Sequence, residues 1–435
     1  MRLGGRIAAA IEVLDTVETR HVPPVDALKD WGWAHRFAGS GDRAVIGNLV
    51  FDCLRWRASS AWLMGSETAR ALMLATLVRH WDMPIDQLVT ALADDPYAPA
   101  PLSDAERMAL SSNGLDRAPD WVRGDYPEWL AGEFVTVFGD EAANEGQGLS
   151  TRAPLDLRVN TLKSDRPKAL KALTHLKAEA TPLSPWGIRV HHGAGPQRQP
   201  SAQAEAVYRK GHVEVQDEGS QLAALLSGAK PGWQVLDLCA GGGGKTLALA
   251  QMLANSGQIY AYDADRKRLA NIHERLQRAG VRAVQVRDPI RPDALADLSG
   301  RMDLVLIDAP CSGSGTWRRR PDTKWRLTEQ ALEKRVTEQD TVLRQAVEAL
   351  KPGGRLVYVT CSVLRRENDD RVAALCDATP SLTPISMDDL IGDVFPGAAG
   401  DRLRACVLPT RFGLQMTPRR TGCDGFYVAA LQQQG

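Results

Sequence analysis

Apolar and polar positions follow a helical period through the first part of this chain. Ile7, Ala10 and Leu14 recur at three- and four-residue spacing, and Ile46 and Leu49 begin a second series of the same kind. This spacing places apolar side chains on one face of a helix. The sequence therefore predicts an all-helical domain over residues 1–122.

The pattern changes after that domain. Residues 123–212 open with a linker helix, and Leu155–Leu162 then alternates between apolar and polar positions as a half-buried strand does. Lys168–Leu176 has the composition of a helix, while Ile188–His191 and His212–Val215 have that of short strands. These elements predict a small α+β unit.

From residue 213 to residue 435, short apolar runs alternate with longer amphipathic ones. Strands are expected at Gln234–Leu238, Gln258–Tyr262, Ala283–Val286, Asp303–Ile307 and Arg355–Val359. Helices are expected at Gly219–Leu226, Thr246–Leu253, Arg266–Ala279, Thr328–Leu350 and Asp369–Asp377. Such alternation is typical of an α/β fold with a parallel sheet covered on both faces. We expect a Rossmann-like domain here.

Composition narrows the class of protein but does not select a partner. The chain has 435 residues and a formal net charge of zero, so any nucleic-acid contact must come from local patches. No apolar run reaches the ~18 residues of a membrane span. The seven cysteines are scattered, with no CxxC pair and no Cys/His cluster. This favours a protein of the reducing cytoplasm without a structural metal, and we expect a monomer.

A glycine-rich loop follows the first strand of the expected sheet. It consists of Cys239, Ala240, Gly241, Gly242, Gly243, Gly244 and Lys245. Glycines let the backbone approach a ligand closely. The loop lacks the spacing of a phosphate-binding P-loop. By itself it could be only a tight turn.

Two acidic residues follow the next two strands and favour a ligand over a turn. Asp263 comes about 20 residues after the loop, where a carboxylate can accept hydrogen bonds from both ribose hydroxyls. Asp288 follows the next strand and can contact an adenine amino group. The combination fits an adenosine-containing cofactor that needs no phosphate site, which predicts S-adenosylmethionine.

Two cysteines follow central strands, and an aspartate lies at the end of one of these strands. In the stretch Met302–Trp325, Asp308 lies at the end of the expected strand and Cys311 follows it. Cys361 lies at the end of the next expected strand. A thiolate that adds to C6 of a pyrimidine makes C5 nucleophilic, and a carboxyl group at N3 favours that addition. Amino-directed methyltransferases carry an aromatic ring where Cys311 stands. These residues predict carbon methylation. One such cysteine alone would most simply be a small buried side chain.

Two basic segments are candidates for RNA contact. Arg158 and Asn160 lie at the same parity of one strand, so they share a face. The second segment interleaves cations with aromatic rings and contains Trp317, Arg318, Arg319, Arg320, Lys324 and Trp325. Such side chains suit phosphates and unpaired bases that are flipped out of a stack. The alternatives are ordinary strand exposure and a loop that packs on the sheet.

The chain resembles the Sun/Fmu-type (RsmB/NOP) family of RNA cytosine-C5 methyltransferases. The resemblance rests on motifs at Leu157–Lys163, Val215–Gln221, Leu236–Thr246, Asp308–Ser312, Arg319–Trp325, Thr360–Val363, Glu367–Asn368 and Asp424–Ala429. It implies that Cys361 attacks C6 and that Cys311 resolves the resulting adduct. It also implies a cofactor pocket at Cys239–Lys245, Asp263, Asp288 and Asp308.

Two features bear on how far the resemblance extends. Gly241–Gly242 stand where the family has Ala-Pro, and the loss of proline predicts a more flexible loop and weaker cofactor binding. Residues 40–57 resemble part of a NusB-like domain, which favours small-subunit ribosomal RNA as substrate. Transfer RNA, a non-catalytic RNA-binding assembly factor and a DNA methyltransferase with Cys311 as nucleophile are the alternatives.

Overall fold

The computed structural model describes residues 1–111, 114–191, 193, 195–197 and 200–434. Its residues group into two compact units. The first unit combines residues 1–152 and 192–199 with the segment 317–326, and the second holds the rest. The three-part division at residues 122 and 212 stays a prediction.

The first unit is helical, as its apolar spacing predicts. Its helices are α1 Leu3–Arg20, α2 Pro24–Ala34, α3 Ser40–Arg55, α4 Arg57–Met64, α5 Ala69–Arg79, α6 Ile85–Ala93, α7 Asp104–Ser111, α8 Asp120–Arg123, α9 Ala131–Phe138, α10 Ala142–Ser150 and α17 Pro321–Arg326. Ile7, Leu14, Ile46 and Leu49 are fully buried in one apolar core. Whether this unit is NusB-like stays a prediction.

The second unit contains two sheets. The smaller has the order β2-β3-β1-β4 and is antiparallel where β1 meets β3 and β4. Its strands are β1 Leu155–Val159, β2 Glu179–Ala180, β3 Gly187–Val190 and β4 Val213–Val215, with helices α11 Arg166–Ala172 and α12 Ala206–Arg209. The predicted small α+β unit is confirmed.

The larger sheet has nine strands in the order β11-β12-β13-β9-β8-β5-β6-β7, and β10 pairs with β13. Its strands are β5 Gln234–Asp237, β6 Gln258–Ala261, β7 Val284–Val286, β8 Met302–Asp308, β9 Leu350–Thr360, β10 Leu382–Pro384, β11 Leu408–Pro409, β12 Gly413–Met416 and β13 Phe426–Gln433. Strands β5 to β9 pair in parallel, and β13 pairs antiparallel with β9. The predicted Rossmann-like sheet is confirmed.

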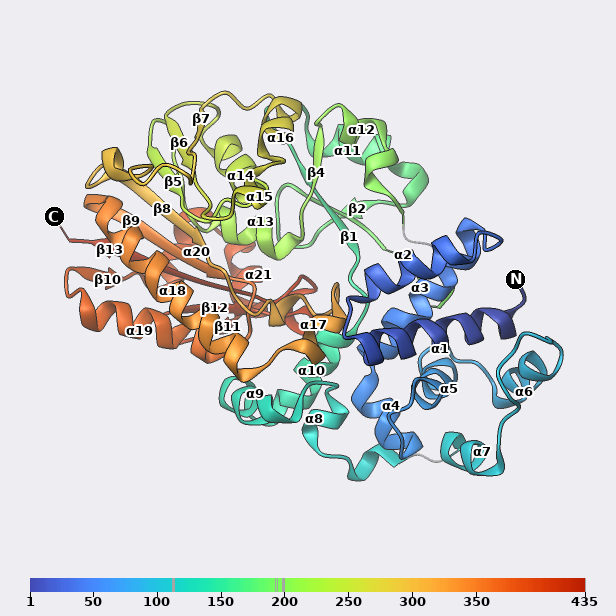
Figure 1. Ribbon diagram of the computed structural model, residues 1–435. Helices are drawn as coiled ribbons and strands as arrows, with labels where there is room; N and C mark the ends of the chain where they lie inside the picture. Colours follow the sequence, from blue (N-terminus) through green and yellow to red (C-terminus); the bar gives the residue numbers. More distant parts are fainter. Residues whose placement is uncertain (112–113, 192, 194, 198–199, 435) are drawn as a thin grey trace. The chain divides into compact units, whose positions relative to one another are not determined.

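Helices cover both faces of this sheet (Figure 1). They are α13 Glu218–Leu225, α14 Gly244–Met252, α15 Arg266–Leu269, α16 Ile272–Ala279, α18 Glu329–Ala349, α19 Asp369–Ala378, α20 Met387–Val394, α21 Ala398–Cys406 and α22 Pro418–Thr421. Alternate strand residues serve the two faces: Leu304 and Leu306 pack with α13, α14, α20 and α21, while Val305 and Ile307 pack with α18 and α19. Burial on both faces explains why these strands read as continuous apolar runs.

The order in which the chain adds strands to the sheet reverses between β5 and β8. From β5 the chain passes outward to β6 and β7, and then returns to β8 and β9 on the other side. The loops after β5 and β8 therefore diverge at a switch point, which is where open α/β sheets bind ligands.

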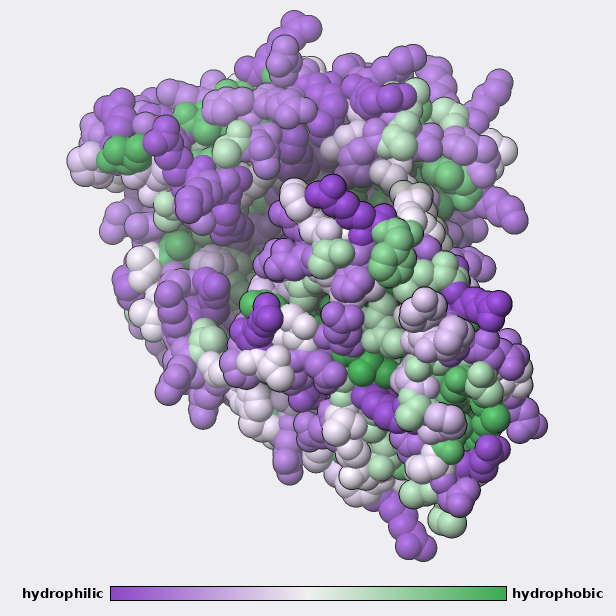
Figure 2. Space-filling view, turned by 45° about the vertical axis from the view of Figure 1, so that its right-hand side comes forward, coloured by the Kyte–Doolittle hydropathy of each residue, from purple (hydrophilic) through white to green (hydrophobic). Residues whose placement is uncertain are grey.

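The face in Figure 2 is mainly hydrophilic, with small separate apolar patches. Within the described ranges, no helix is long and apolar enough to cross a membrane.

Candidate active site at the sheet's switch point

The glycine loop lies between β5 and α14, at the switch point. Gly243 has φ +83°, and a Cβ there would come within 2.7 Å of Ile272. Only glycine combines a positive φ with the absence of a Cβ, so only glycine fits here without strain. Arg275 donates a hydrogen bond to the carbonyl oxygen of Gly242, which fixes the middle of the loop. The sequence forms a tight loop here because its glycines accept this backbone.

A buried acid at the start of the loop has an oxygen without a partner. Asp237 ends β5 and is fully buried, and its Oδ2 accepts a hydrogen bond of 2.6 Å from Thr246. Its Oδ1 has no hydrogen-bond partner in the described part of the chain. Burial raises the pKa of Asp237 to about 7, and the charges of Asp308 and Asp263 act in the same direction. A buried acceptor without a partner is unfavourable, so this site suits a ligand that donates a hydrogen bond.

The predicted cofactor acids are placed differently from one another. Asp263 is buried, where its Oδ2 accepts 2.9 Å from the Gly241 N–H and its Oδ1 accepts 2.8 Å from the Asp265 N–H. Each carboxylate oxygen of Asp263 has a second lone pair that can accept a hydrogen bond from a ligand. Nη1 of Arg268 lies 3.3 Å from Oδ2 of Asp263. Burial raises the pKa of Cys239, with Asp263 and Asp237 adding to the effect. These effects favour the protonated form of the Cys239 thiol.

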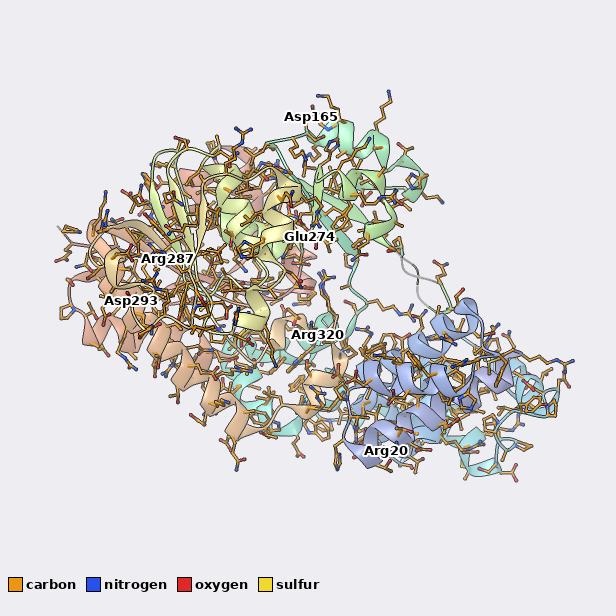
Figure 3. All side chains as sticks on the ribbon, turned by 45° about the horizontal axis from the view of Figure 1, so that its top comes forward. Arg20, Asp165, Glu274, Arg287, Asp293 and Arg320 are labelled. Atoms are coloured by element: carbon orange, nitrogen blue, oxygen red, sulfur yellow. The ribbon has the colours of Figure 1, made fainter. Side chains whose placement is uncertain are left out.

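Asp288 lies apart from these buried acids, on an exposed turn after β7. Its Oδ1 accepts a hydrogen bond of 3.1 Å from the Ile290 N–H. It lines a cavity of about 410 Å³ that also includes Arg287 and Asp293, both labelled in Figure 3. Its contact with an adenine amino group stays a prediction.

Asp308 ends β8 beside the glycine loop. Its Oδ2 forms an ion pair of 2.7 Å with Nζ of Lys245, which is 5% exposed. The ammonium also lies 5.1 Å from the centre of the Phe426 ring. Lys245 thereby links the glycine loop to the strand end that precedes Cys311.

The two cysteines of the adjacent strand ends face each other. Strands β8 and β9 pair in parallel, with Asp308 opposite Val359, so the loops that follow them leave the sheet side by side. The Sγ atoms of Cys311 and Cys361 are 3.3 Å apart. The hydrogen bond between them raises the pKa of Cys311 well above its usual value, and burial and the charges of Cys361 and Glu367 act in the same direction. These contacts favour the protonated form of Cys311.

The prediction that Arg158 and Asn160 contact RNA is wrong, because both are buried. Arg158 is 1% exposed and donates hydrogen bonds of 2.6 Å to both Gln216 and Gln251. Asn160 donates to backbone carbonyls of Gly211 and Ala279. The two side chains share a face, as predicted, but that face packs inside the unit.

The basic segment after Cys311 also differs from its prediction. Lys324 and Arg318 are buried in the helical unit, and Nζ of Lys324 donates 3.0 Å bonds to the Arg55 carbonyl and to Oγ of Ser150. Their predicted contact with RNA is therefore wrong. Arg319 and Arg320 are exposed, and Figure 3 labels Arg320. Their contact with RNA stays a prediction.

Sequence reasoning also missed Asp237, Glu367 and Asn368 as members of the site. Asp237 was visible as the last residue of a strand before the glycine loop. Glu367 and Asn368 gave no signal beyond the family motif, and the partners of Glu367, Ser312 and Gln339, lie far from it in the sequence.

Comparisons with known proteins agree with this geometry. The family described as 16S rRNA methyltransferase RsmB/F matches residues 224–432, and its ferredoxin-like domain matches residues 126–195. The ribosomal RNA small subunit methyltransferase B of Sodalis glossinidius is 34% identical over 337 residues, which cover 77% of this chain and 69% of the relative. The chain belongs to the RsmB/F methyltransferase family. The protein of the same name from Cronobacter sakazakii is 31% identical over 414 residues, 90% of each chain.

Solved structures agree on the fold. A methyltransferase homologue from Pyrococcus horikoshii is 26% identical, with a TM-score of 0.56 over 72% of this chain and 97% of that one. NSun6 from the same organism, solved with the S-adenosylmethionine analogue SFG, is 21% identical with a TM-score of 0.59 over 71% and 98%. The predicted family and its cofactor, S-adenosylmethionine, are confirmed.

The residues of this RsmB/F-family chain suit that cofactor. The buried Oδ1 of Asp237, beside the glycine loop, lacks a hydrogen-bond donor, which a bound ligand can supply. The loop Cys239–Lys245, Asp237 and Asp263 would hold the cofactor. Within the described residues no group of acids, histidines and cysteines could hold a metal ion.

Proposed function

We propose that this chain methylates C5 of an unpaired cytosine in small-subunit ribosomal RNA through a covalent bond between Cys361 and C6. The observation that carries the proposal is the 3.3 Å separation of the Cys311 and Cys361 sulfurs at two adjacent strand ends. The names of the relatives, ribosomal RNA small subunit methyltransferase B, support the choice of substrate.

The two thiols differ in a way that suits two roles. The hydrogen bond from its neighbour and burial raise the pKa of Cys311, and we therefore assign the role of nucleophile to Cys361. The thiolate of Cys361 adds to C6, so that the ring electrons shift toward C5 and make it nucleophilic. Asp308 favours this addition by donating a proton to N3 of the ring, and the ammonium of Lys245, 2.7 Å from its Oδ2, can replace that proton.

S-adenosylmethionine supplies an electrophilic methyl group for C5. The adduct is resolved when Cys311, as a thiolate, takes the C5 proton, the C5–C6 double bond forms again and Cys361 leaves C6 as a thiolate. Cys311 takes part in this second stage, as its place beside Cys361 suggests. Arg319 and Arg320 contribute phosphate contacts.

The test is transfer of labelled methyl to separated pools of ribosomal and transfer RNA, with wild type, Cys361→Ala and Cys311→Ala. Wild type should label cytosine C5 in ribosomal RNA, Cys361→Ala should lose activity, and Cys311→Ala should accumulate an RNA adduct resistant to denaturant. Cys376→Ala, a half-buried cysteine of α19, is the matched control.

Other outcomes would replace parts of the proposal. Label in transfer RNA alone would change the substrate. Activity in Cys361→Ala with none in Cys311→Ala would reverse the nucleophile. Binding of RNA and cofactor without label in any pool would favour a non-catalytic assembly factor.

A further inference from the structure

Glu367 and Asn368 are two adjacent buried polar residues just after β9. Their exposed fractions are 0% and 3%. Their hydrogen bonds run to the residues that flank the two cysteines. The mechanism proposed above assigns them no role.

Glu367 holds the loop that carries Cys311. Its Oε1 accepts hydrogen bonds from the Ser312 N–H at 2.7 Å and from Nε2 of Gln339 at 3.1 Å, and its Oε2 accepts one from the Ser312 hydroxyl. The same Gln339 amide donates 2.9 Å to the carbonyl of Pro310. Both neighbours of Cys311 are thus fixed, one directly by Glu367 and one through Gln339.

Asn368 holds the loop that carries Cys361. Its Oδ1 accepts a hydrogen bond from the Thr360 hydroxyl, and its Nδ2 donates 3.1 Å to the carbonyl of Ser362. Nδ2 also donates 3.1 Å to Oε1 of Gln415, which fixes the orientation of the amide. Both neighbours of Cys361 are therefore bound to one side chain.

We propose that Glu367 and Asn368 are positioning residues that clamp the two cysteine loops together and set the distance between the Cys311 and Cys361 sulfurs. Neighbouring residues share one short backbone segment, so a displacement of either loop must move the other. The role in catalysis rests on the proposed two-thiol mechanism, but the clamp itself can be measured without RNA.

Burial of the Glu367 carboxylate costs free energy, and a purely structural role does not explain why a charged group stands there. Its side-chain partners are the neutral donors Ser312 and Gln339, and within the described residues it forms no ion pair. A buried carboxylate without a cation is unfavourable. Its negative charge nevertheless favours the protonated form of Cys311, together with the larger effects of Cys361 and burial. Tyr358, whose hydroxyl donates a hydrogen bond to the Glu367 carbonyl, is a further titratable group near this thiol.

The test separates geometry from charge with two variants of the whole chain. Thr360→Val removes the hydroxyl that donates to Asn368 and keeps the side-chain shape. Glu367→Gln keeps the shape and removes the charge. Glu338→Gln, a half-exposed carboxyl group of α18, is the matched control for the second variant.

The first readout is the rate at which oxidised glutathione converts Cys311 and Cys361 to a disulfide, followed by peptide mapping. We expect Thr360→Val to lower this rate at least fivefold. The second readout is the pH dependence of Cys311 alkylation by iodoacetamide. We expect Glu367→Gln to move it about one pH unit lower, because the charge that favours the thiol is gone, whereas Glu338→Gln leaves it unchanged.

The methylation kinetics then connect the clamp to function. Both variants should lower kcat about tenfold and leave KM for S-adenosylmethionine unchanged. Unchanged disulfide formation in Thr360→Val and an unchanged alkylation profile in Glu367→Gln would overturn the clamp. If wild type itself does not methylate cytosine, the proposed function fails, while the two thiol readouts still decide the clamp.

Discussion

Two buried lysines, Lys245 and Lys324, carry different chemistry because their partners differ. Lys245 forms a 2.7 Å ion pair with Asp308 at the edge of the site. Lys324 donates to a backbone carbonyl and to a serine hydroxyl, and its Nζ lies 5.9 Å and 5.1 Å from the rings of Trp317 and Trp325. Burial lowers the pKa of Lys324 to about 7, although the charge of Asp125 opposes the shift. A direct carboxylate partner makes the first lysine part of the site, whereas the second anchors a segment.

The largest expected effect concerns the pH dependence of stability at Lys324. The unfolded lysine has a pKa near 10.5 and the folded one about 7. Between these values the unfolded state binds more protons, so the free energy of unfolding rises with pH, by at most ~4 kcal/mol. We expect Lys324→Met to lose this rise. Urea unfolding at pH 7 and pH 9.5, followed by tryptophan fluorescence, measures it.

The control for that prediction is Lys334→Met, which removes an exposed lysine. It should keep the wild-type rise. Parallel pH profiles for wild type and Lys324→Met would show that Lys324 is not the group responsible. At lower pH, burial raises the pKa of Asp125 to about 6, so stability should fall as pH rises from about 4 to 6.

The second prediction concerns cofactor affinity, which should depend on Lys245 and not on Lys324. Lys245→Met leaves the Asp308 carboxylate without its cation beside the cofactor loop, so we expect cofactor affinity to fall ~10- to 30-fold. Lys324→Met should leave it unchanged. Isothermal titration of S-adenosylmethionine measures both. Equal losses in the two variants would mean that the lysines do not differ in function.

The third prediction extends the comparison to the exposed arginines. Arg319→Ala and Arg320→Ala should each weaken RNA binding ~3- to 10-fold and reduce the salt dependence by about one phosphate contact. The buried Arg158 should affect stability instead, since its guanidinium is bound to Gln216 and Gln251. Filter binding between 50 and 200 mM salt tests this, and an unchanged slope for both exposed variants would exclude them from the RNA interface.

The smallest expected effect is at the glycine loop. Gly242→Pro reduces the freedom of the unliganded loop, so we expect S-adenosylmethionine to bind ~2- to 5-fold more tightly. Isothermal titration measures the change. An unchanged dissociation constant would show that ordering of this loop does not limit binding, and that Arg275 already holds it at Gly242.

The sequence by itself determined the strands β5 to β9, the helices between them and the order of the chemical groups, whereas the strands β10 to β13 were not predicted. The strands β6 and β7, nearer the edge of the sheet, were identified by alternating or mixed patterns. Continuous apolar runs identified β8 and the second half of β9, because a strand covered on both faces needs apolar residues at every position. The glycine loop, Asp308, Cys311 and Cys361 were visible for the same reason: they follow such strands, and parallel strands bring their carboxyl ends to one edge.

Only the tertiary structure decided which polar side chains are buried and which partners they meet. The parity of Arg158 and Asn160 was correct, but strand parity cannot say whether a face meets solvent or a helix. Lys324 and Glu367 likewise depend on Ser150, Ser312 and Gln339, all far away in the chain. Local spacing sets the direction in which a side chain leaves the backbone, whereas the fold decides which residues or solvent that side chain contacts.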